Sequence, residues 1–234
     1  MKNQYFGDIN DYRKYGLLRL LSGSGQIRTA VCWMLTPDDG RADGGFITYL
    51  QEPDEWRHYD PPLFDYLRDL VLDENLRDVR GAETPAILPS CRFACGLLPD
   101  DAEGRARYFE TFMDISKDCD LVFFDPDNGI EVKSKPYGRK DSSKYVYWRE
   151  LIETFSGGHS LLIYQHFPRI KRERFIETKA RELARKTEAR DVYSFRTPNV
   201  LFLLAPQERH RDSFRKRSKK VAGVWASQIR VTSH

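Results

Sequence analysis

The chain has 234 residues, of which 40% are hydrophobic and 13% aromatic, and its formal net charge is +3 at pH 7. This length and composition suffice for a sizeable core, and the near-neutral charge means that a nucleic-acid partner must be attracted by a local patch. No apolar run is long enough for a membrane span, the first residues lack the apolar core of a secretory signal, and four cysteines make no disulfide framework. We therefore expect a cytoplasmic protein with reduced thiols and no membrane partner.

Helical and strand patterns alternate along the chain. The patterns predict helices at 11–21, 63–72, 105–115, 144–155 and 171–185, and strands at 27–35, 85–89, 120–124, 160–164, 191–195 and 200–204. Such alternation is typical of a mostly parallel sheet with helices on both faces. We expect one α/β domain over residues 1–234, with a Rossmann-like doubly wound sheet and an antiparallel pair of strands at its C-terminal end.

The sharpest functional signal follows the strand at 120–124. This apolar run stops at Asp125, Pro126, Asp127 and Asn128, and the next buried strand stops near His166. Open α/β sheets bind ligands at the carboxyl ends of their strands. These five residues are therefore our candidate catalytic residues, and His166 would lie beside Asp125 if the two strands are neighbours.

These motifs resemble a known family. The order of helix, strand 120–124, helix, strand 161–164, helix and final strand pair is similar to the second half of the S-adenosylmethionine-dependent class I methyltransferases. Asp125-Pro126-Asp127-Asn128 resembles their Asp/Asn-Pro-Pro-aromatic motif, which marks enzymes that methylate exocyclic amino groups of nucleobases. Residues 7–15 look like the N-terminal segment of bacterial large-subunit rRNA adenine-N6 methyltransferases, and three-Cys-motif partner proteins have a similar layout. The resemblance implies S-adenosylmethionine as cofactor and DNA or RNA as partner.

The motif has a chemical reason. An amino nitrogen on a nucleobase is a poor nucleophile because its lone pair is delocalised into the ring. A side-chain oxygen of Asp125 and a backbone carbonyl beside Pro126 can accept its two N–H groups and direct the lone pair toward a methyl donor, while proline keeps the turn rigid. In this chain Asp127 and Asn128 replace the second proline and the aromatic residue. A stacking side chain must therefore come from elsewhere, and the candidates are Tyr145, Tyr147, Trp148 and Phe167.

The loop after the first strand is the counterpart of the family's cofactor loop. In this chain, Pro37-Asp38-Asp39-Gly40 and then Gly44-Gly45 stand in place of the family's Gly-x-Gly sequence. These glycines permit a close approach of the backbone to a ligand. The resemblance implies that Thr36 and residues 38–45 contact the cofactor. The cofactor-binding candidates are Thr36, Asp38, Asp39, Gly40, Gly44 and Gly45.

Two other functions compete with methyl transfer. In a metal-dependent nuclease, Asp125 and Glu131 would bind Mg²⁺ and Lys133 would polarise the attacking water. The predicted order of elements argues against this function, because a helix precedes the strand that carries Asp125 and another helix follows it. The third possibility is a catalytically inactive module that binds nucleic acid or protein; in the leading hypothesis no metal is required.

A basic segment covers residues 209–220. It is either a solvated helix face or a surface that contacts phosphates. The candidate nucleic-acid-binding residues in it are Arg215, Lys216, Arg217, Lys219 and Lys220.

Overall fold

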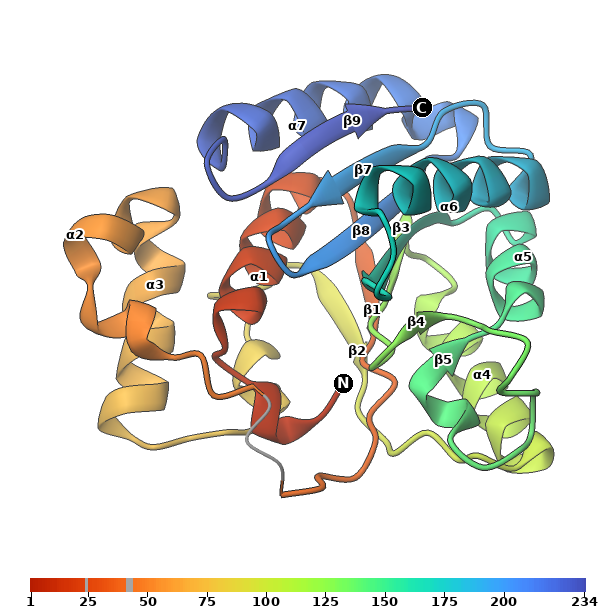
Figure 1. Cartoon of the computed structure of the whole chain (residues 1–234), viewed down its shortest axis with the longest axis horizontal. Coiled ribbons are helices and arrows are strands. Elements are labelled where there is room, and N and C mark those ends of the chain that lie inside the picture. The colour runs from red at the N-terminus through yellow and green to blue at the C-terminus, as the bar shows by residue number, and fades with distance from the viewer. Residues whose placement is uncertain (24, 41–43) are drawn as a thin grey trace.

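The computed structural model describes residues 1–23, 25–40 and 44–234. Within these ranges the chain forms one seven-stranded sheet in the order β2-β1-β3-β6-β8-β7-β9 (Figure 1). The strands are β1 (Thr29–Cys32), β2 (Cys91–Ala94), β3 (Leu121–Phe124), β6 (Ser160–His166), β7 (Tyr193–Arg196), β8 (Val200–Ala205) and β9 (Arg230–Ser233).

The sheet is parallel on one side and antiparallel on the other. Strands β2, β1, β3 and β6 run parallel to one another. The hairpin β7–β8 then joins the sheet through β8, which is antiparallel to β6, and β9 pairs antiparallel with β7. This arrangement confirms the predicted Rossmann-like α/β fold and its antiparallel C-terminal strands.

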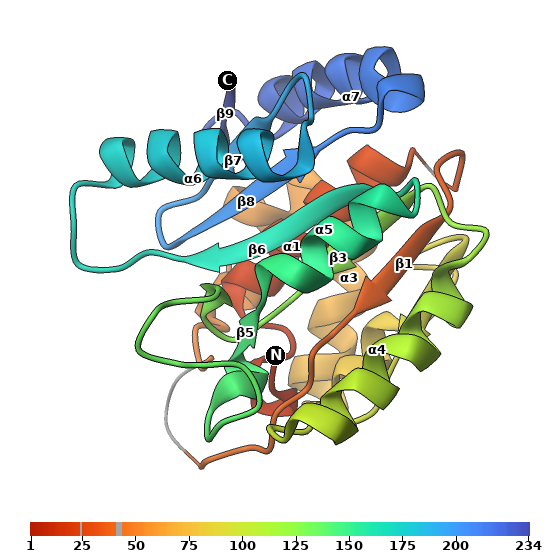
Figure 2. The same ribbon diagram turned by 90° about the vertical axis from the view of Figure 1, so that its right-hand side faces the viewer.

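Helices cover both faces of the sheet, as Figures 1 and 2 show. One face carries α1 (Ile9–Ser22), α3 (Pro61–Arg68) and α7 (Arg211–Val224), with the short α2 (Pro53–Trp56) outside them, and the other carries α4 (Ala102–Ser116), α5 (Trp148–Ser156) and α6 (Arg172–Thr187). Strand β3 explains the two-sided core, because Leu121 and Phe123 pack toward α1 whereas Val122 and Phe124 pack toward α4. Successive side chains of a strand point to opposite faces, so a strand covered on both faces reads as a continuous apolar run.

Helix α1 places the N-terminal part of the chain at the carboxyl edge of the sheet. Its first turn is capped by Asp8, whose side chain accepts a hydrogen bond from the backbone N–H of Asn10. The helix ends at Gly23, which has the left-handed conformation with φ of 57° that glycine tolerates. Because α1 precedes β1 and runs antiparallel to it, the N-terminal turn of α1 lies near the carboxyl end of β1.

Two predicted elements differ from the structure, and one strand of the seven-stranded sheet was not predicted. The strand predicted at 85–89 is a series of turns, and the edge strand is β2, which follows it; the two prolines of the predicted segment suit turns better than a ladder. The helix predicted at 144–155 begins only at Trp148, because Tyr145 and Val146 form β5 and pair with β4 (Gly129–Ile130) in a separate two-stranded sheet. Strand β9 has no counterpart in the prediction, since its exposed side chains lack the apolar pattern of a buried strand.

A buried arginine holds the segment around β5 in place. Arg105 of α4 is fully buried, and its guanidinium donates to both carboxylate oxygens of Glu150 at 2.6 and 2.9 Å. It also donates to the carbonyls of Ser142 and Tyr145. One side chain thus joins α4, β5 and α5, and the paired charges satisfy each other where water is excluded.

None of the helices within the described residues combines the length and the apolarity that a membrane crossing requires.

The close contact between α1 and α7 yields a stability prediction. A Cβ added at Gly16 would lie 2.2 Å from the buried ring of Trp225, whereas one added at Gly223 has no neighbour within 4 Å. Gly16→Ala should therefore lower the free energy of unfolding by about 1–3 kcal/mol through overpacking. The matched variant Gly223→Ala should raise it by about 0.5–1 kcal/mol, because alanine favours an exposed helix. Urea unfolding of both variants measures the difference, and equal effects would contradict this packing.

Candidate functional site

The strand register brings the predicted residues to the carboxyl edge of the sheet. Cys32 of β1 pairs with Phe124 of β3, and Phe124 pairs with Ile163 of β6, so β1 and β3 end at the same level and β6 continues beyond them to His166. In the sheet, β2 lies on one side of β1 and β3 lies on the other. The strand order therefore reverses between β1 and β3, and Asp125 directly follows β3 at this point. Such a switch point forms a crevice in open α/β sheets.

A cavity of about 570 Å³ opens to solvent at this edge. Its size is in the range of sites for small molecules. Four parts of the chain line it: the first turns of α1 with the residues before them, Gly44 and Phe46 of the segment after β1, the turn after β3, and the end of β6 with the starts of α6 and β8. The lining residues are Met1, Tyr5, Asp8, Asn10, Asp11, Lys14, Gly44, Phe46, Asp125, Pro126, Asp127, Asn128, Tyr164, His166, Phe167, Arg172, Asn199 and Val200.

The centre of the site is a buried ammonium group between two carboxylates. Nζ of Lys14 lies 2.6 Å from Oδ1 of Asp11 and 2.7 Å from Oδ2 of Asp125, and all three side chains are at most 5% exposed. Asp11 also accepts hydrogen bonds from the backbone N–H of Gly7 and the hydroxyl of Tyr15. The cluster ties α1 to the end of β3 and fixes the orientation of the Asp125 carboxylate.

Burial and the neighbouring charges raise the pKa values of Asp11 and Lys14. Burial raises the pKa of Asp11 from 3.8 to about 6; the ammonium of Lys14 opposes the shift, and the nearby carboxylates of Asp125 and Asp8 add to it. Burial also opposes a charge on Lys14, but Asp11 and Asp125 together raise its pKa above the ordinary value. Lys14 therefore stays an ammonium and is not a general base, while Asp11 titrates near neutral pH.

Asp127 is bound by a different set of groups. Its Oδ2 accepts a hydrogen bond from the hydroxyl of Thr36 at 2.7 Å, and its Oδ1 lies 2.7 Å from the amino group of Met1. Burial alone would raise the pKa of Asp127, but the amino group of Met1, the hydroxyl of Thr36 and the charge of Lys2 hold it below the ordinary value. Asp127 is thus an ionised carboxylate that holds the residues before α1 against the loop after β1.

The turn from Asn128 to Ile130 is held by Gln165. The side-chain amide of Gln165 donates to the carbonyls of Asn128 and His166 at 3.1 and 2.9 Å and accepts from the N–H of Ile130 at 3.0 Å. Gly129 has a φ of 111°, and a Cβ there would lie 2.4 Å from the Gln165 amide, so only glycine fits. As predicted for neighbouring strands, His166 lies beside this turn and lines the cavity, with its side chain exposed.

The described residues of the predicted cofactor loop make contacts mainly with the protein itself. Asp38 and Asp39 contact residues 2–4, and of the candidate residues in the loop only Gly44 lines the cavity. A Cβ at Gly44 would lie 2.4 Å from Tyr5, so the close approach there is to the protein itself. A Cβ added at Gly40 would meet no described atom within 4 Å, and Gly45 is exposed. Positions 41–43 of the loop lie outside the described residues.

The cavity, in contrast, presents hydrogen-bond acceptors. Oδ1 of Asn10 is buried and has no hydrogen-bond partner among the described residues. Oδ1 of Asp125 and the carbonyl oxygen of Pro126 likewise accept no hydrogen bond from any residue in the described ranges. A ligand rich in N–H or O–H donors, such as an amino group, fits this set of acceptors.

The residues of the nuclease hypothesis do not meet in the cavity. Neither Glu131 nor Lys133 lines it. The carboxylate of Glu131 faces the charges of Lys186, Glu150 and Glu182, and burial raises its pKa. Among the described residues, no group of three or more His, Cys, Asp and Glu side chains is placed to hold a metal ion.

Of the four candidates for stacking on a base, only Phe167 lines the cavity. Its ring lies 6.0 Å from that of Phe175 and carries the guanidinium of Arg172 5.0 Å above its centroid. Tyr147 lies against the guanidinium of Arg105 instead, and Trp148 is a buried residue that contacts lysines of α6.

The basic segment forms α7, which does not line the cavity. The helix packs against α1 and β9 and covers the sheet face at the top of Figure 1. Arg215 pairs with Asp212, and Arg217 donates to Gln26, whereas Lys216, Lys219 and Lys220 are exposed and make no ion pair within the described residues.

The sequence prediction did not identify Asp11 and Lys14 as site residues. Both lie in a helix that was assigned only by its apolar stripe, and a charged residue in a surface helix usually faces water. The usable signal was their spacing, because Asp8, Asp11 and Lys14 recur every three residues and therefore share one face of α1.

Comparison with known proteins does not identify this site. No protein-family model matches the chain, and no curated protein matches its sequence. Its chemistry is therefore inferred from the geometry.

Substitutions of different members of the buried cluster should lower the free energy of unfolding by different amounts. Lys14→Met leaves two carboxylates buried without a counter-charge and should lower the free energy of unfolding by about 3–5 kcal/mol. The control Asp11→Asn keeps one carboxylate for the ammonium and should cost clearly less. Denaturant unfolding near pH 7 measures both, and equal losses would show that Lys14 is not the counter-charge of the cluster.

The raised pKa of Asp11 predicts a pH dependence of stability. Because the folded protein holds this proton more tightly than the unfolded chain, the stabilising contribution is complete below pH 3.8 and is lost as the pH rises through about 6. Between these values the wild type should lose on the order of 2 kcal/mol relative to Asp11→Asn. Unfolding of both proteins from pH 4 to pH 7 tests this, and parallel pH profiles would contradict it.

Proposed function

We propose that the protein is a methyltransferase-like enzyme that binds an exocyclic amino group of a nucleobase, in DNA or RNA, at the carboxyl edge of the sheet. The observation that carries the proposal is the pair of acceptors without partners, Oδ1 of Asp125 and the carbonyl oxygen of Pro126, in adjacent residues of the cavity wall. Two acceptors side by side match the two N–H groups of an amino substituent. S-adenosylmethionine would supply the methyl group.

Lys14 acts as a positioning residue in this proposal. Its ammonium binds Oδ2 of Asp125, which leaves Oδ1 for the ligand and prevents rotation of the carboxylate. Lys14 is shared between Asp11 and Asp125. Asp125 therefore remains a stronger hydrogen-bond acceptor than it would be if it alone neutralised the ammonium. Groups fixed before the ligand arrives need no reorganisation during the reaction.

The rest of the cavity supports a donor-rich ligand. Four carboxylates line it, from Asp8, Asp11, Asp125 and Asp127, and Asn10 adds a buried oxygen without a partner. These four carboxylates outnumber the three cationic residues of the wall, Met1, Lys14 and Arg172, so the interior suits the amino groups of a base better than the phosphates of the backbone. The ring of Phe167, with its guanidinium partner, provides an aromatic surface at the wall.

One observation favours a second candidate, a module that binds nucleic acid without catalysis. Residues 1–5 cover the loop after β1, where the resemblance placed cofactor contacts. The N–H of Thr36 donates to the carbonyl of Met1, and Asp38 and Asp39 bind Gln4. In this candidate the cavity still receives a base, but no methyl donor binds.

Two measurements distinguish these functions. Calorimetry with S-adenosylmethionine and S-adenosylhomocysteine should detect binding at millimolar ligand or below, and transfer of labelled methyl groups to transcribed RNA or single-stranded DNA should follow. Asp125→Ala should reduce transfer by about 100-fold or more, because it removes one acceptor of the amino group. Glu131→Gln, which alters a carboxylate outside the cavity, should leave transfer unchanged.

Other results would overturn the proposal. Absence of heat with both ligands would leave only the binding module. Magnesium-dependent cleavage of DNA or RNA that disappears in Glu131→Gln would replace methyl transfer with nuclease activity.

A further inference from the structure

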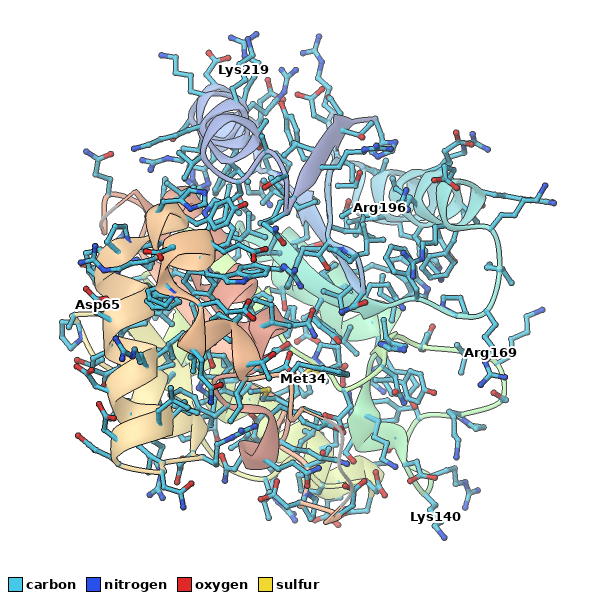
Figure 3. The ribbon with its side chains drawn as sticks, turned by 60° about the vertical axis from the view of Figure 1, so that its left-hand side comes forward. Met34, Asp65, Lys140, Arg169, Arg196 and Lys219 are labelled. Atoms are coloured by element: carbon cyan, nitrogen blue, oxygen red, sulfur yellow. The ribbon has the colours of Figure 1, made fainter. Side chains whose placement is uncertain are left out.

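Exposed basic side chains gather on the two loops beside the cavity. The loop from β4 to β5 and the loop from β6 to α6 project on the same side of the molecule, on the left in Figure 2. In Figure 3, where Arg169 and Lys140 are labelled, both reach outward on the right. We call their exposed cations the basic rim: Lys133, Arg139, Lys140, Arg169 and Lys171.

The basic rim is not neutralised by the protein. None of its five side chains forms an ion pair or a hydrogen bond with any residue in the described ranges, whereas Lys135 and Lys144 in the same loop both pair with Asp141. Unpaired cations on two adjacent loops produce a positive potential, and a partner that carries regularly spaced negative charges neutralises it best.

The rim is continuous with the cavity. The N–H of His166 donates to the carbonyl of Asn128 at 3.2 Å, so the two loops start from adjacent residues of the cavity wall. Arg172 follows the rim in sequence, lines the cavity, and donates to the carbonyl of Pro198. The basic rim and the carboxylates of the cavity therefore belong to one continuous surface. The exposed loops of this surface carry the cations, and the cavity wall carries the carboxylates.

Apolar side chains are exposed on the same edge. Phe46 lines the cavity and is 66% exposed, Ile170 lies between two residues of the rim and is 57% exposed, and Val132 precedes Lys133 and is 43% exposed. Positively charged surfaces with exposed aromatic side chains are typical of proteins that bind single-stranded nucleic acids, and Phe46 is an exposed aromatic residue at this edge.

We propose that the basic rim binds the phosphodiester backbone of a single-stranded nucleic acid whose base enters the cavity, and that α7 is not the phosphate-binding surface. This inference rests on the proposed function in that the cavity receives a base. It adds the path that the nucleic acid takes across the protein. The rim would bind the phosphates, and the carboxylates of the cavity would exclude them.

The test compares two sets of four substitutions. The rim variant carries Lys133→Ala, Lys140→Ala, Arg169→Ala and Lys171→Ala; the matched α7 variant carries Arg215→Ala, Lys216→Ala, Lys219→Ala and Lys220→Ala. All eight side chains are exposed, so thermal unfolding should be similar. Fluorescence anisotropy measures binding of labelled single-stranded RNA, and of DNA of the same sequence, from about 50 to 200 mM salt.

The rim variant should bind at least about tenfold more weakly at the low-salt end, and the slope of log K against log salt should become shallower by up to about 3, at about 0.7 per lost contact. The α7 variant should keep the slope of the wild type. A slope that is unchanged in the rim variant, or one that is reduced equally in the α7 variant, would overturn the inference and support the sequence prediction for α7.

The outcomes for the rim and for the proposed function remain distinct. Binding that depends on the rim, without methyl transfer, supports the rim and rejects the enzyme. Methyl transfer with a slope that is insensitive to the rim supports the enzyme and rejects the rim. If neither RNA nor DNA binds to the wild type, both are rejected.

Discussion

The buried ion cluster of Asp11, Lys14 and Asp125 is the constraint on which the site depends. Removing an ammonium from water is costly, and here two carboxylates at 2.6 and 2.7 Å compensate for it. Because the partners come from α1 and from the end of β3, their pairing sets how the first helix lies against the central strand. The cavity forms between those two elements, so the cluster determines both its position and its charge.

The opposite charges of the site and its surroundings follow from topology. Parallel strands deliver their loops to one edge of the sheet, and here the tight turn after β3 carries acids while the longer loops after β4 and β6 carry exposed cations. The turn is held by hydrogen bonds to Gln165 and to neighbouring backbone, and its residues line the cavity. The longer loops extend beyond it into water. A ligand that crosses this edge thus meets positive charge first and negative charge inside.

The sequence predicted the strands that are buried on both faces, because a run such as Leu121–Phe124 must be apolar throughout. It also predicted that Asp125 and His166 lie near each other, since β3 and β6 are parallel neighbours. It did not predict the role of Lys14, because the local spacing of charges on α1 does not indicate a partner that is 111 residues away in sequence. Nor did it predict β9, whose edge position requires no apolar alternation.

Gln165 has a consequence for how the site can diverge. Within the described residues, its amide makes hydrogen bonds only with main-chain atoms, those of Asn128, Ile130 and His166, so the backbone from Asn128 to Ile130 is held whatever side chain stands at position 128. Asn128 lines the cavity, and its side chain makes no hydrogen bond within the described residues. A substitution at position 128 therefore changes a side chain of the cavity wall without rebuilding the turn, provided that Gly129 and Gln165 are retained.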